Sequence, residues 1–547
     1  MLNSKKIDYV LLFLFWTALT LITIYYLNIN KTPLTYDAAA YCEISGLIGH
    51  QLHGFHFIKA FEIFIHHNPW GNRPGLYMFI GGFFAVLSNF NIELTVLFSN
   101  MFWFGLLIWF TYNIAQSCYG KGGILSAFML ITSYGVILMY RNFLLDIPLT
   151  VGVLFSLISF VKYWKHEYSN SKDGVIFYGS LIIGALLKET FVLYAFPIFL
   201  YHLLSIYKFQ DKNSLLKQFM RYYLIVMAIV LLFYVPLLSQ LIKNMVGNVT
   251  EEVGKYYARS FDKSSVAYYL AYFYLLSSFT SIYFVIMPIF FYALDLLIRY
   301  TNKIQITPKI NECTILLCVV CIVPVIILTV LVVDTDARFI LPILPIILIL
   351  MSNIINSVKY IVLKTLCVIC ILLIGIVNFT TSVKYVYWLP GKVTYEHFIL
   401  FSQEVFSEVK TLRFGFTSSK QDWKTREILE TLMALSGNKY INIANLTSMW
   451  YLSTNTLRAY SSFKDANLNI YDIDINTLAG LEDAQYIITT NGKLTNDPKL
   501  SINKLNNINE YIFRQIKNDK YQIIQKYSLP NGDNVYIIKN QKNKSNE

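Results

Sequence analysis

Charged residues are scarce in this chain of 547 residues, and their scarcity limits the classes of protein to which it can belong. Asp, Glu, Lys and Arg make up 14% of the sequence, hydrophobic residues make up 55%, and the mean hydropathy is +0.48. Soluble domains carry roughly 25% charged residues, so the composition excludes a water-soluble protein built around one core. Long apolar runs recur from residue 9 to about residue 384. Many approach the roughly 20 residues that an α-helix needs to cross a bilayer.

Cysteines are also few, and their placement predicts neither a disulfide framework nor a zinc site. Of the seven, only Cys42 falls in a predicted external loop, since the others lie within or directly after apolar runs. The net charge of +12 could indicate a nucleic-acid partner. In a membrane protein, however, cytoplasmic lysines and sites for anionic head groups account for such an excess. We therefore expect a lipid bilayer and no nucleic acid as partners.

The composition changes near Leu389, which predicts two domains. Residues 1–388 are predicted to form an all-α polytopic membrane domain, and residues 389–547 a soluble α/β domain. In the second domain we expect strands over 413–417 and 484–490, a helix over 424–435, and a hairpin whose strands, 521–527 and 534–539, flank the Pro-Asn-Gly-Asp turn at 530–533. No P-loop, nucleophile triad or dinucleotide fingerprint occurs there.

The positive-inside rule predicts how the chain crosses the membrane. Residues 9–27 form a retained first helix rather than a signal peptide, and residues 28–75 follow as a long external loop. The short apolar segment 76–87 is predicted to be re-entrant or interfacial. About eleven spans fit the alternation, or thirteen if two ambiguous segments cross; the clearest are 94–114, 124–140, 148–161, 175–187, 191–206, 222–241, 316–333, 339–355 and 366–383. The C-terminal domain is then external.

This alternation gathers ionisable residues on the external side of the membrane: Asp37, Glu43, Arg73, Arg141, Asp146, Lys188, Glu189, Arg259, Asp334, Asp336 and Arg338. Ionisable groups at the ends of membrane helices are costly to desolvate, so they usually line a cavity or mark an interface. A cavity lined by carboxylates and cations suits a substrate with a phosphate head and a lipid tail.

Five segments in this order resemble C-type (GT-C) glycosyltransferases of the protein O-mannosyltransferase and aminoarabinose-transferase kind. The family has an aspartate motif after the first helix and then a Lys-Pro-Pro-Leu-Tyr-like segment. The matching segments are 35–44 (TYDAAAYCEI), 68–77 (NPWGNRPGLY), 141–150 (RNFLLDIPLT), 184–190 (GALLKET) and 338–345 (RFILPILP). The resemblance covers roughly the first 350 residues and implies a GT-C membrane fold.

The resemblance also implies which carboxylates act in catalysis. Asp37 matches the family's catalytic aspartate and is the predicted general base, and Asp146 is a second active-site acid that holds the acceptor or polarises the site. Each has an alternative, because either aspartate could cap the helix that follows it. The family often has a second acid after the catalytic aspartate, whereas Ala38 stands here, which favours a distant branch of the family.

Four cations are predicted to bind the donor phosphate: Arg73, Lys188, Arg259 and Arg338. Arg73 occupies the family's lysine position before proline, and its alternative is an arginine that snorkels to the interface. Lys188 interrupts two apolar runs and could instead pair with Glu189 or another acid. Arg259 and Arg338 are less specific candidates.

Metal binding has weaker support in the sequence. The histidines of the first loop, His50, His53, His56, His66 and His67, lie near Glu62 at spacings that form no known ligand set. Some relatives use an acid beside the Lys-Pro-Pro segment for a divalent ion, whereas Asn72 stands there. We therefore predict no metal ligands and no firm cofactor, although the resemblance allows a divalent cation.

The resemblance implies an integral membrane glycosyltransferase, inverting by analogy. It would move a sugar from a polyprenyl-phosphate donor to a protein, lipid or envelope-glycan acceptor on the outer face of the plasma membrane. The main alternative is a flippase or transporter of polyprenyl-linked glycans, which also needs an amphipathic cavity and phosphate-binding cations. A non-catalytic scaffold is a third class, but it would not require acids and cations at one membrane face.

Overall fold

The structure is a computed structural model, and its described residues form two compact units. One unit contains the described parts of Met1–Tyr25, Trp70–Tyr77 and Asn100–Thr417, and the other those of Tyr26–Pro69, Met78–Ser99 and Ser418–Glu547. The described residues are 4–34, 36–66, 75–140, 143–239, 242–243, 281–303, 311–331, 337–383, 421–437, 439–449, 451–473, 480–492, 494 and 502–541.

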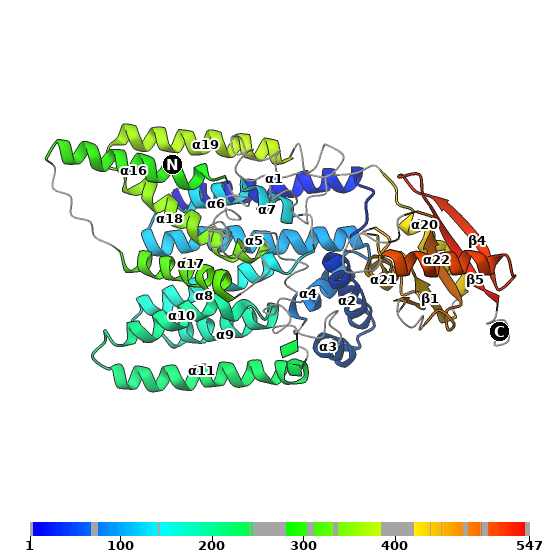
Figure 1. The fold of residues 1–547 in the computed structure, drawn as a ribbon. Coiled ribbons are helices and arrows are strands. Elements are labelled where there is room, and N and C mark those ends of the chain that lie inside the picture. Colours follow the sequence, from blue (N-terminus) through cyan, green and yellow to red (C-terminus); the bar gives the residue numbers. More distant parts are fainter. Residues whose placement is uncertain are drawn as a thin grey trace. The chain divides into compact units, whose positions relative to one another are not determined.

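The first unit is helical, and several of its long helices run side by side (Figure 1). Its helices are most of α1 (Ser4–Ile29) and α5 (Ile92–Tyr119), then α6 (Gly123–Ile131), α7 (Tyr134–Met139), α8 (Asp146–Lys165), α9 (Ser171–Leu187), α10 (Phe191–Ile206), α11 (Lys212–Tyr234), η1 (Val235–Leu237), α16 (Tyr283–Thr301), α17 (Glu312–Leu331), η2 (Ala337–Ile343), α18 (Leu344–Ser357) and α19 (Ile361–Val383). Among the described residues, eight helices are long and apolar enough to cross a membrane. The chain is thus a multi-pass membrane protein. The count of eleven to thirteen spans stays a prediction, because residues 244–280 lie outside the described part.

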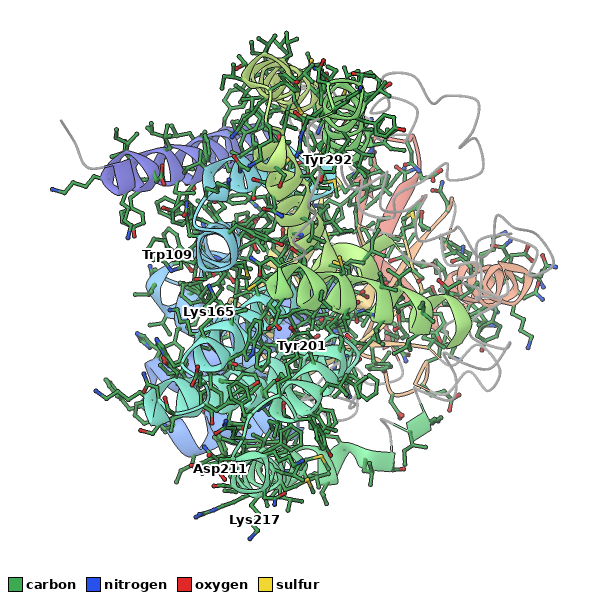
Figure 2. The ribbon with its side chains drawn as sticks, turned by 90° about the vertical axis from the view of Figure 1, so that its left-hand side faces the viewer. Trp109, Lys165, Tyr201, Asp211, Lys217 and Tyr292 are labelled. Atoms are coloured by element: carbon green, nitrogen blue, oxygen red, sulfur yellow. The ribbon has the colours of Figure 1, made fainter. Side chains whose placement is uncertain are left out.

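Contacts between helix ends agree with the predicted alternation of the spans. Lys165, Asp211 and Lys217 lie at the same end of this unit (Figure 2). Polar contacts join other ends that the positive-inside rule assigns to the cytoplasm: Lys121 with the carbonyl of Asn356, Lys165 with that of Ser117, Lys208 with Glu312, and Asn302 with Tyr360. Asp146 is the first residue of α8, and Lys188 directly follows α9. Both therefore lie at the opposite ends of those two helices.

One predicted span is broken in the structure. Residues 124–140 were predicted to form one helix, but α6 ends at Ile131 and α7 begins at Tyr134. The hydroxyl groups of Thr132 and Ser133 donate to the carbonyls of Phe128 (2.8 Å) and Met129 (2.7 Å). The break leaves the Thr132 carbonyl accessible, and the Asn378 side-chain amide of α19 donates to it. Local hydrogen bonds from Ser and Thr hydroxyl groups, such as those of Thr132 and Ser133, compete with a continuous helix.

The second unit includes helices in the segment predicted as a long external loop. This segment contains α2 (Tyr36–His53) and α3 (Phe57–His66), and α4 (Leu76–Leu87) has the bounds predicted for the short apolar segment. Helix α2 is buried along most of its length because α3 and α21 (Thr454–Ser462) both pack on it. The prediction of a loop there was wrong, since small residues such as Gly46 and Gly49 obscure the helical pattern.

The C-terminal part is α/β, as predicted. Its sheet has the order β2-β1-β3-β5-β4 and consists of β1 (Ile441–Asn445), β2 (Leu468–Asp472), β3 (Tyr486–Thr490), β4 (Tyr521–Ser528) and β5 (Asn534–Asn540). β1 pairs in parallel with β2 and β3, whereas β5 runs antiparallel to β3 and β4. Helices α20 (Thr425–Ser436), α21 and α22 (Ile502–Ile516) accompany the sheet.

The predicted elements of this domain agree with the structure where it describes them. The hairpin of β4 and β5 turns at Gly532, whose φ of 87° is one that glycine adopts easily. β3 and α20 also lie where the sequence predicted them, and Gly437 ends α20 in the left-handed conformation. The strand predicted over 413–417 lies outside the described residues, and the domain boundary at Leu389 stays a prediction.

Candidate active site

A buried ion pair joins the start of α8 to the end of α9. The ammonium group of Lys188 donates to Oδ1 of Asp146 at 2.8 Å. Both residues are buried, with Asp146 2% and Lys188 8% exposed. Two predicted site residues that are 42 positions apart in the chain are thus brought together. One of the two interpretations of Lys188, that it pairs with an acid, is observed, and contact with a phosphate remains a prediction.

Close packing of α8 against α9 brings the pair together. A Cβ atom added at Gly152 would lie 3.2 Å from Cα of Gly184, and one at Gly184 would lie 2.2 Å from the ring of Phe191. Only glycine therefore allows these two helices and the start of α10 to approach so closely. Lys188 follows α9 in an extended conformation, with φ −160° and ψ 139°. This extended residue ends the helix and lets the side chain reach Asp146.

The 3₁₀ helix η2 is the third element of this site, after α8 and α9. The ammonium group of Lys188 lies 5.8 Å from the ring centroid of Phe339, a distance at which a cation is attracted by an aromatic face. The Tyr194 hydroxyl of α10 donates to the backbone carbonyl of Phe339. Arg338 precedes Phe339 in the chain, and its side chain is outside the described part.

Asp146 is the first residue of α8, but its carboxylate does not cap that helix by the expected geometry. The N-cap residue is Leu145, which offers no side-chain cap. The Asp146 carboxylate instead accepts from Lys188, and its backbone carbonyl accepts from Thr150 at 2.7 Å. The Asp146 carboxylate is thus engaged by a cation from the end of α9.

Asp37 lies in the first turn of α2, in the other compact unit, where it is half-buried. The N-terminus of a helix interacts favourably with a negatively charged group. A partly accessible carboxylate can accept a proton from a hydroxyl group. Helix capping and catalysis use the same charge, so the position is compatible with both interpretations of Asp37.

The structure does not describe every predicted site residue. Arg73 and Arg259 lie outside the described residues, as do Arg141, Asp334, Asp336 and Asn72. Glu189 is half-buried directly after Lys188. The roles of Arg73, Arg259 and Arg338 at a donor phosphate therefore stay predictions.

Two histidines of the first segment, His50 and His53, take part in aromatic packing. The ring of His50 stacks on Phe90 with centroids 4.0 Å apart, and that of His53 lies edge-on to Phe90 at 5.7 Å. Within the described ranges, no group of three or more His, Cys, Asp or Glu side chains could hold a metal ion. We assign no step of the chemistry to a divalent cation.

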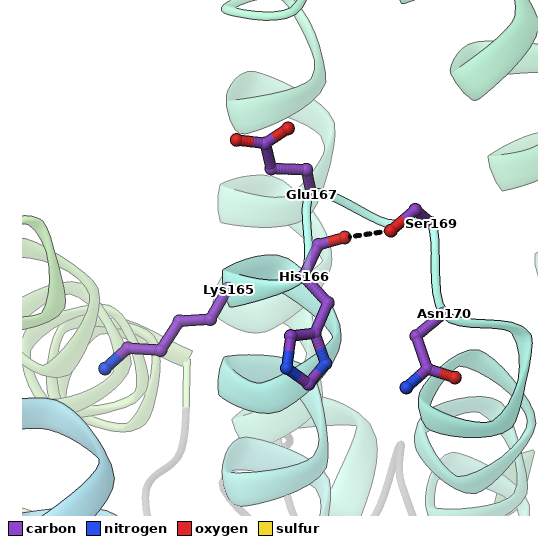
Figure 3. Close-up of a pocket in the computed structure, with 5 residues that line it drawn as sticks. All are labelled: Lys165, His166, Glu167, Ser169 and Asn170. Carbon is purple, nitrogen blue, oxygen red and sulfur yellow. Dashed lines mark hydrogen bonds between the residues drawn. The ribbon is translucent and has the colours of Figure 1, made fainter.

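A separate hollow lies in the turn between α8 and α9, at the far end of these helices from Asp146. It has a volume of about 410 Å³ and is lined by Lys165, His166, Glu167, Ser169 and Asn170 (Figure 3). Its polar groups are used locally: Ser169 donates to the His166 carbonyl at 2.6 Å, and the His166 ring lies 2.6 Å from the Asp173 carboxylate. We assign no role to this hollow.

Sequence reasoning missed the polar contacts that join α2 and the start of α5 to the C-terminal domain. Nε of Arg458 in α21 lies 3.2 Å from Oε1 of Glu43. The Tyr460 hydroxyl donates to Glu93 at 3.2 Å, and Arg426 of α20 pairs with the same carboxylate. No local motif marks Arg458 or Tyr460, because their partners are hundreds of residues away in the chain. Of the residues in these contacts, only Glu43 was singled out from the sequence, as an ionisable residue on the external side.

Comparisons with known proteins support this reading of the fold. Residues 72–239 match the sequence model of the family described as dolichyl-phosphate-mannose-protein mannosyltransferase. No curated protein sequence matches the chain significantly.

Solved structures with low sequence identity share the fold over almost the whole chain. ArnT from Cupriavidus metallidurans in the apo state matches with a TM-score of 0.53 and 9% identity, covering 95% of this chain and 97% of that one. The same protein bound to undecaprenyl phosphate matches with a TM-score of 0.50, 10% identity and the same coverage. The Archaeoglobus fulgidus oligosaccharyltransferase in complex with Zn and sulfate matches with a TM-score of 0.51 and 11% identity, covering 95% of this chain and 72% of that one.

The chain therefore has the fold of the GT-C glycosyltransferases, a membrane-embedded helical part followed by a C-terminal α/β part. The resemblance predicted from five short segments is confirmed by the family match and by these structures.

Proposed function

We propose that the protein is an integral membrane glycosyltransferase. It transfers a sugar from a polyprenyl-phosphate donor to a hydroxyl-bearing or other nucleophilic acceptor, with inversion at the anomeric carbon. The acceptor is a protein, a lipid or an envelope glycan. The GT-C fold supports this class, and the undecaprenyl phosphate bound by ArnT supports the donor type.

The observation that carries the proposal is the buried Lys188–Asp146 pair beside Phe339. An ammonium group has three N–H donors, so one bond to Asp146 does not exhaust Lys188. A buried cation with donors to spare can bind a phosphate oxygen while its own position is held by a carboxylate. Asp146 in this scheme orients Lys188 and is not the proton acceptor.

The proposed reaction uses Asp37 as the general base. The Asp37 carboxylate accepts the acceptor's proton as the acceptor oxygen or nitrogen bonds to the anomeric carbon. The bond from that carbon to the phosphate oxygen breaks, and its electron pair leaves with polyprenyl phosphate. The leaving phosphate gains negative charge during this step, and Lys188, Arg73, Arg259 and Arg338 are proposed to stabilise it. Attack opposite the leaving group inverts the anomeric configuration.

A transfer assay tests this function. Purified protein in liposomes would be given a panel of undecaprenyl-phosphate monosaccharides together with candidate acceptors, and the products would be followed by mass spectrometry. We expect free undecaprenyl phosphate and a glycosylated acceptor in equal amounts. Movement of the intact lipid-linked sugar across the bilayer, without bond cleavage, would contradict the proposal and favour a flippase.

We also propose that the protein lies in the plasma membrane with its C-terminal domain outside. The helix-end contacts described above support the alternation on which this orientation rests. Single cysteines introduced near Asp37, near Asp146 and after Leu389 should react with a membrane-impermeant maleimide added from outside. Protection of any one of these positions in intact cells would contradict the orientation.

A further inference from the structure

Helix α2, which carries Asp37 in its first turn, is packed tightly on two sides. Against α21, a Cβ atom added at Gly46 would lie 2.7 Å from Oγ of Ser462 and 2.8 Å from the ring of Phe463. Against α4, a Cβ atom at Gly49 would lie 3.0 Å from Cβ of Ala85. Contacts this close fix the axis of α2, and the C-terminal domain supplies one of the two surfaces.

Polar contacts fix α2 along its length as well. Arg458 of α21 pairs with Glu43, which lies on α2 six residues after Asp37. The Tyr460 hydroxyl donates to Glu93 at the start of α5, and it also lies close to the backbone of Leu34. Leu34 precedes Asp37 by three residues.

The surroundings of Tyr460 make this arrangement stiff. The residue is buried, and the guanidinium carbon of Arg426 lies 5.9 Å from the centroid of its ring. Arg426 also pairs with Glu93, so a phenol, a guanidinium group and a carboxylate fix one another. The Arg426 side chain is 64% exposed and that of Glu93 29%, so Tyr460 is the buried member of this network. Polar groups that satisfy one another restrict the backbone to which they are bonded.

We infer that Arg458 and Tyr460 are positioning residues for Asp37: the C-terminal domain holds the first turn of α2 so that the Asp37 carboxylate meets the acceptor. This inference rests on the proposed function. It gives the C-terminal domain a part in the rate of the reaction, through a helix of the N-terminal region.

The sheet of the C-terminal domain is consistent with this role. Ligands of α/β sheets usually bind where strand order reverses, which here is the carboxyl end of β1 and β3. The Asn445 side-chain amide donates there to the carbonyls of Thr447 and Leu452, each at 2.9 Å, and the Thr447 hydroxyl donates to Leu452 at 2.8 Å. Internal bonds thus use these polar groups, and the domain faces α2 with its helix α21.

Replacement of a single hydroxyl group tests the inference. Tyr460→Phe keeps the ring but removes the hydrogen bond to Glu93 and the polar contact with the Leu34 backbone. We expect kcat for sugar transfer to fall by between about tenfold and about a hundredfold, because small displacements of a catalytic group have effects of that size. Binding of undecaprenyl phosphate should change by less than about twofold, since no donor-binding group is altered. Tyr471→Phe is the matched control: it removes a hydroxyl bond to Gly480 in the same domain, and it should leave kcat unchanged.

Hydrogen exchange of the full-length protein supplies a readout that does not depend on activity. In Tyr460→Phe, amides of residues 36–41 should exchange about tenfold faster, the factor expected for loss of one hydrogen bond, while those of α22 keep their wild-type rate. In Tyr471→Phe, residues 36–41 should be unaffected. If Tyr460→Phe changed neither kcat nor exchange in α2, or changed exchange equally in all segments, the inference would be overturned.

A charge exchange gives a second, independent variant. Arg458→Glu places two carboxylates together and should lower kcat at least as much as Tyr460→Phe, whereas adding Glu43→Lys should restore a large part of it. No restoration in the double variant would count against the Arg458 role. A wild-type protein that transferred no sugar would overturn the proposed function itself, and the exchange of residues 36–41 would still decide whether Tyr460 holds α2.

Discussion

The ammonium group of Lys188 lies 2.8 Å from a carboxylate oxygen of Asp146, and both residues are buried. The charge of Asp146 is thus balanced before a substrate arrives. A buried ion pair contributes little net stability, but breaking it by removing one partner is costly. In the proposed function the two predicted catalytic aspartates have different roles: Asp146 orients a cation, and Asp37 accepts the proton.

The pair can be tested with a double-mutant cycle. Lys188→Met should destabilise the folded protein by about 3–5 kcal/mol because it leaves a buried carboxylate without its cation. Lys188→Met combined with Asp146→Asn should recover most of that loss, although both variants should bind undecaprenyl phosphate weakly. Thermal unfolding in detergent measures the coupling. Lys172→Met, at an exposed lysine of α9, is the control. Additive effects of Lys188→Met and Asp146→Asn would contradict a direct interaction between the two side chains.

The packing of α2 on α21 predicts an unusual response to alanine. A glycine within a helix is ordinarily about 1 kcal/mol less favourable than alanine, so Gly→Ala in open space should stabilise. Gly179 of α9 has no atom within 4 Å of an added Cβ atom, whereas Gly46 has Ser462 at 2.7 Å. Gly179→Ala should raise the melting temperature, and Gly46→Ala should lower both the melting temperature and kcat. Equal effects at the two positions would show that α2 and α21 are not packed in this way.

A buried carboxylate at the other end of the first unit is expected to be structural. Oδ1 of Asp295 in α16 accepts from the backbone N–H groups of Lys359 and Tyr360, each at 2.9 Å, just before α19 begins. Asp295→Ala leaves both donors unsatisfied and should cost about 2–4 kcal/mol of stability, while Asp295→Asn retains an acceptor oxygen and should cost less. Transfer per folded molecule should be unchanged in both variants. A specific loss of kcat in Asp295→Asn would assign this residue to the reaction.

The ionisation of Glu43 predicts a pH dependence. Burial raises the pKa of Glu43 above its usual value of 4.5, and Arg458 opposes this shift only in part. A carboxyl with a higher pKa in the folded chain binds more protons there than in the unfolded chain, so stability falls as pH rises from about 4.5 through the folded pKa. Glu43→Gln should therefore melt at a higher temperature than wild type at neutral pH, and the difference should shrink towards pH 4.5.

The exposed Glu62 of α3 provides the control for this titration. Glu62→Gln should give a melting temperature that differs little from wild type at each pH. If Glu43→Gln and wild type melted in parallel across the whole range, the buried state of Glu43 would be wrong.

Much of the membrane fold could be predicted because its elements depend on local composition. The bounds of α4 and α10 match the predicted segments, since a continuous apolar run bordered by polar residues defines both ends. The break between α6 and α7 was not predicted, because the apolar run continues on both sides of Thr132 and Ser133, whose hydroxyl groups donate to carbonyls of α6. The contact of Asn378 with the freed carbonyl comes from a distant helix. In the C-terminal domain the turn at Gly532 was evident, whereas β1 and β2 are five-residue strands with polar positions.

The candidate site was predictable as a list of residues and much less so as a set of contacts. Asp146 and Lys188 followed from the resemblance and the alternation of spans, but their pairing depends on the close approach at Gly152 and Gly184. Arg458 and Tyr460 could not be found, because α21 carries them in a polar sequence with no motif. Their relevance arises only from the packing of α21 on α2.

The most direct test of the account is sugar transfer by Asp37→Asn. Asparagine keeps the shape of the side chain but cannot accept the acceptor's proton at neutral pH, and general-base catalysis is typically worth about 10² to 10⁴ in rate. In liposomes with undecaprenyl-phosphate sugars, transfer measured by mass spectrometry should fall by that factor, while undecaprenyl phosphate binds as it does to wild type. Transfer at the wild-type rate by a folded Asp37→Asn protein would contradict the central claim that Asp37 is the base.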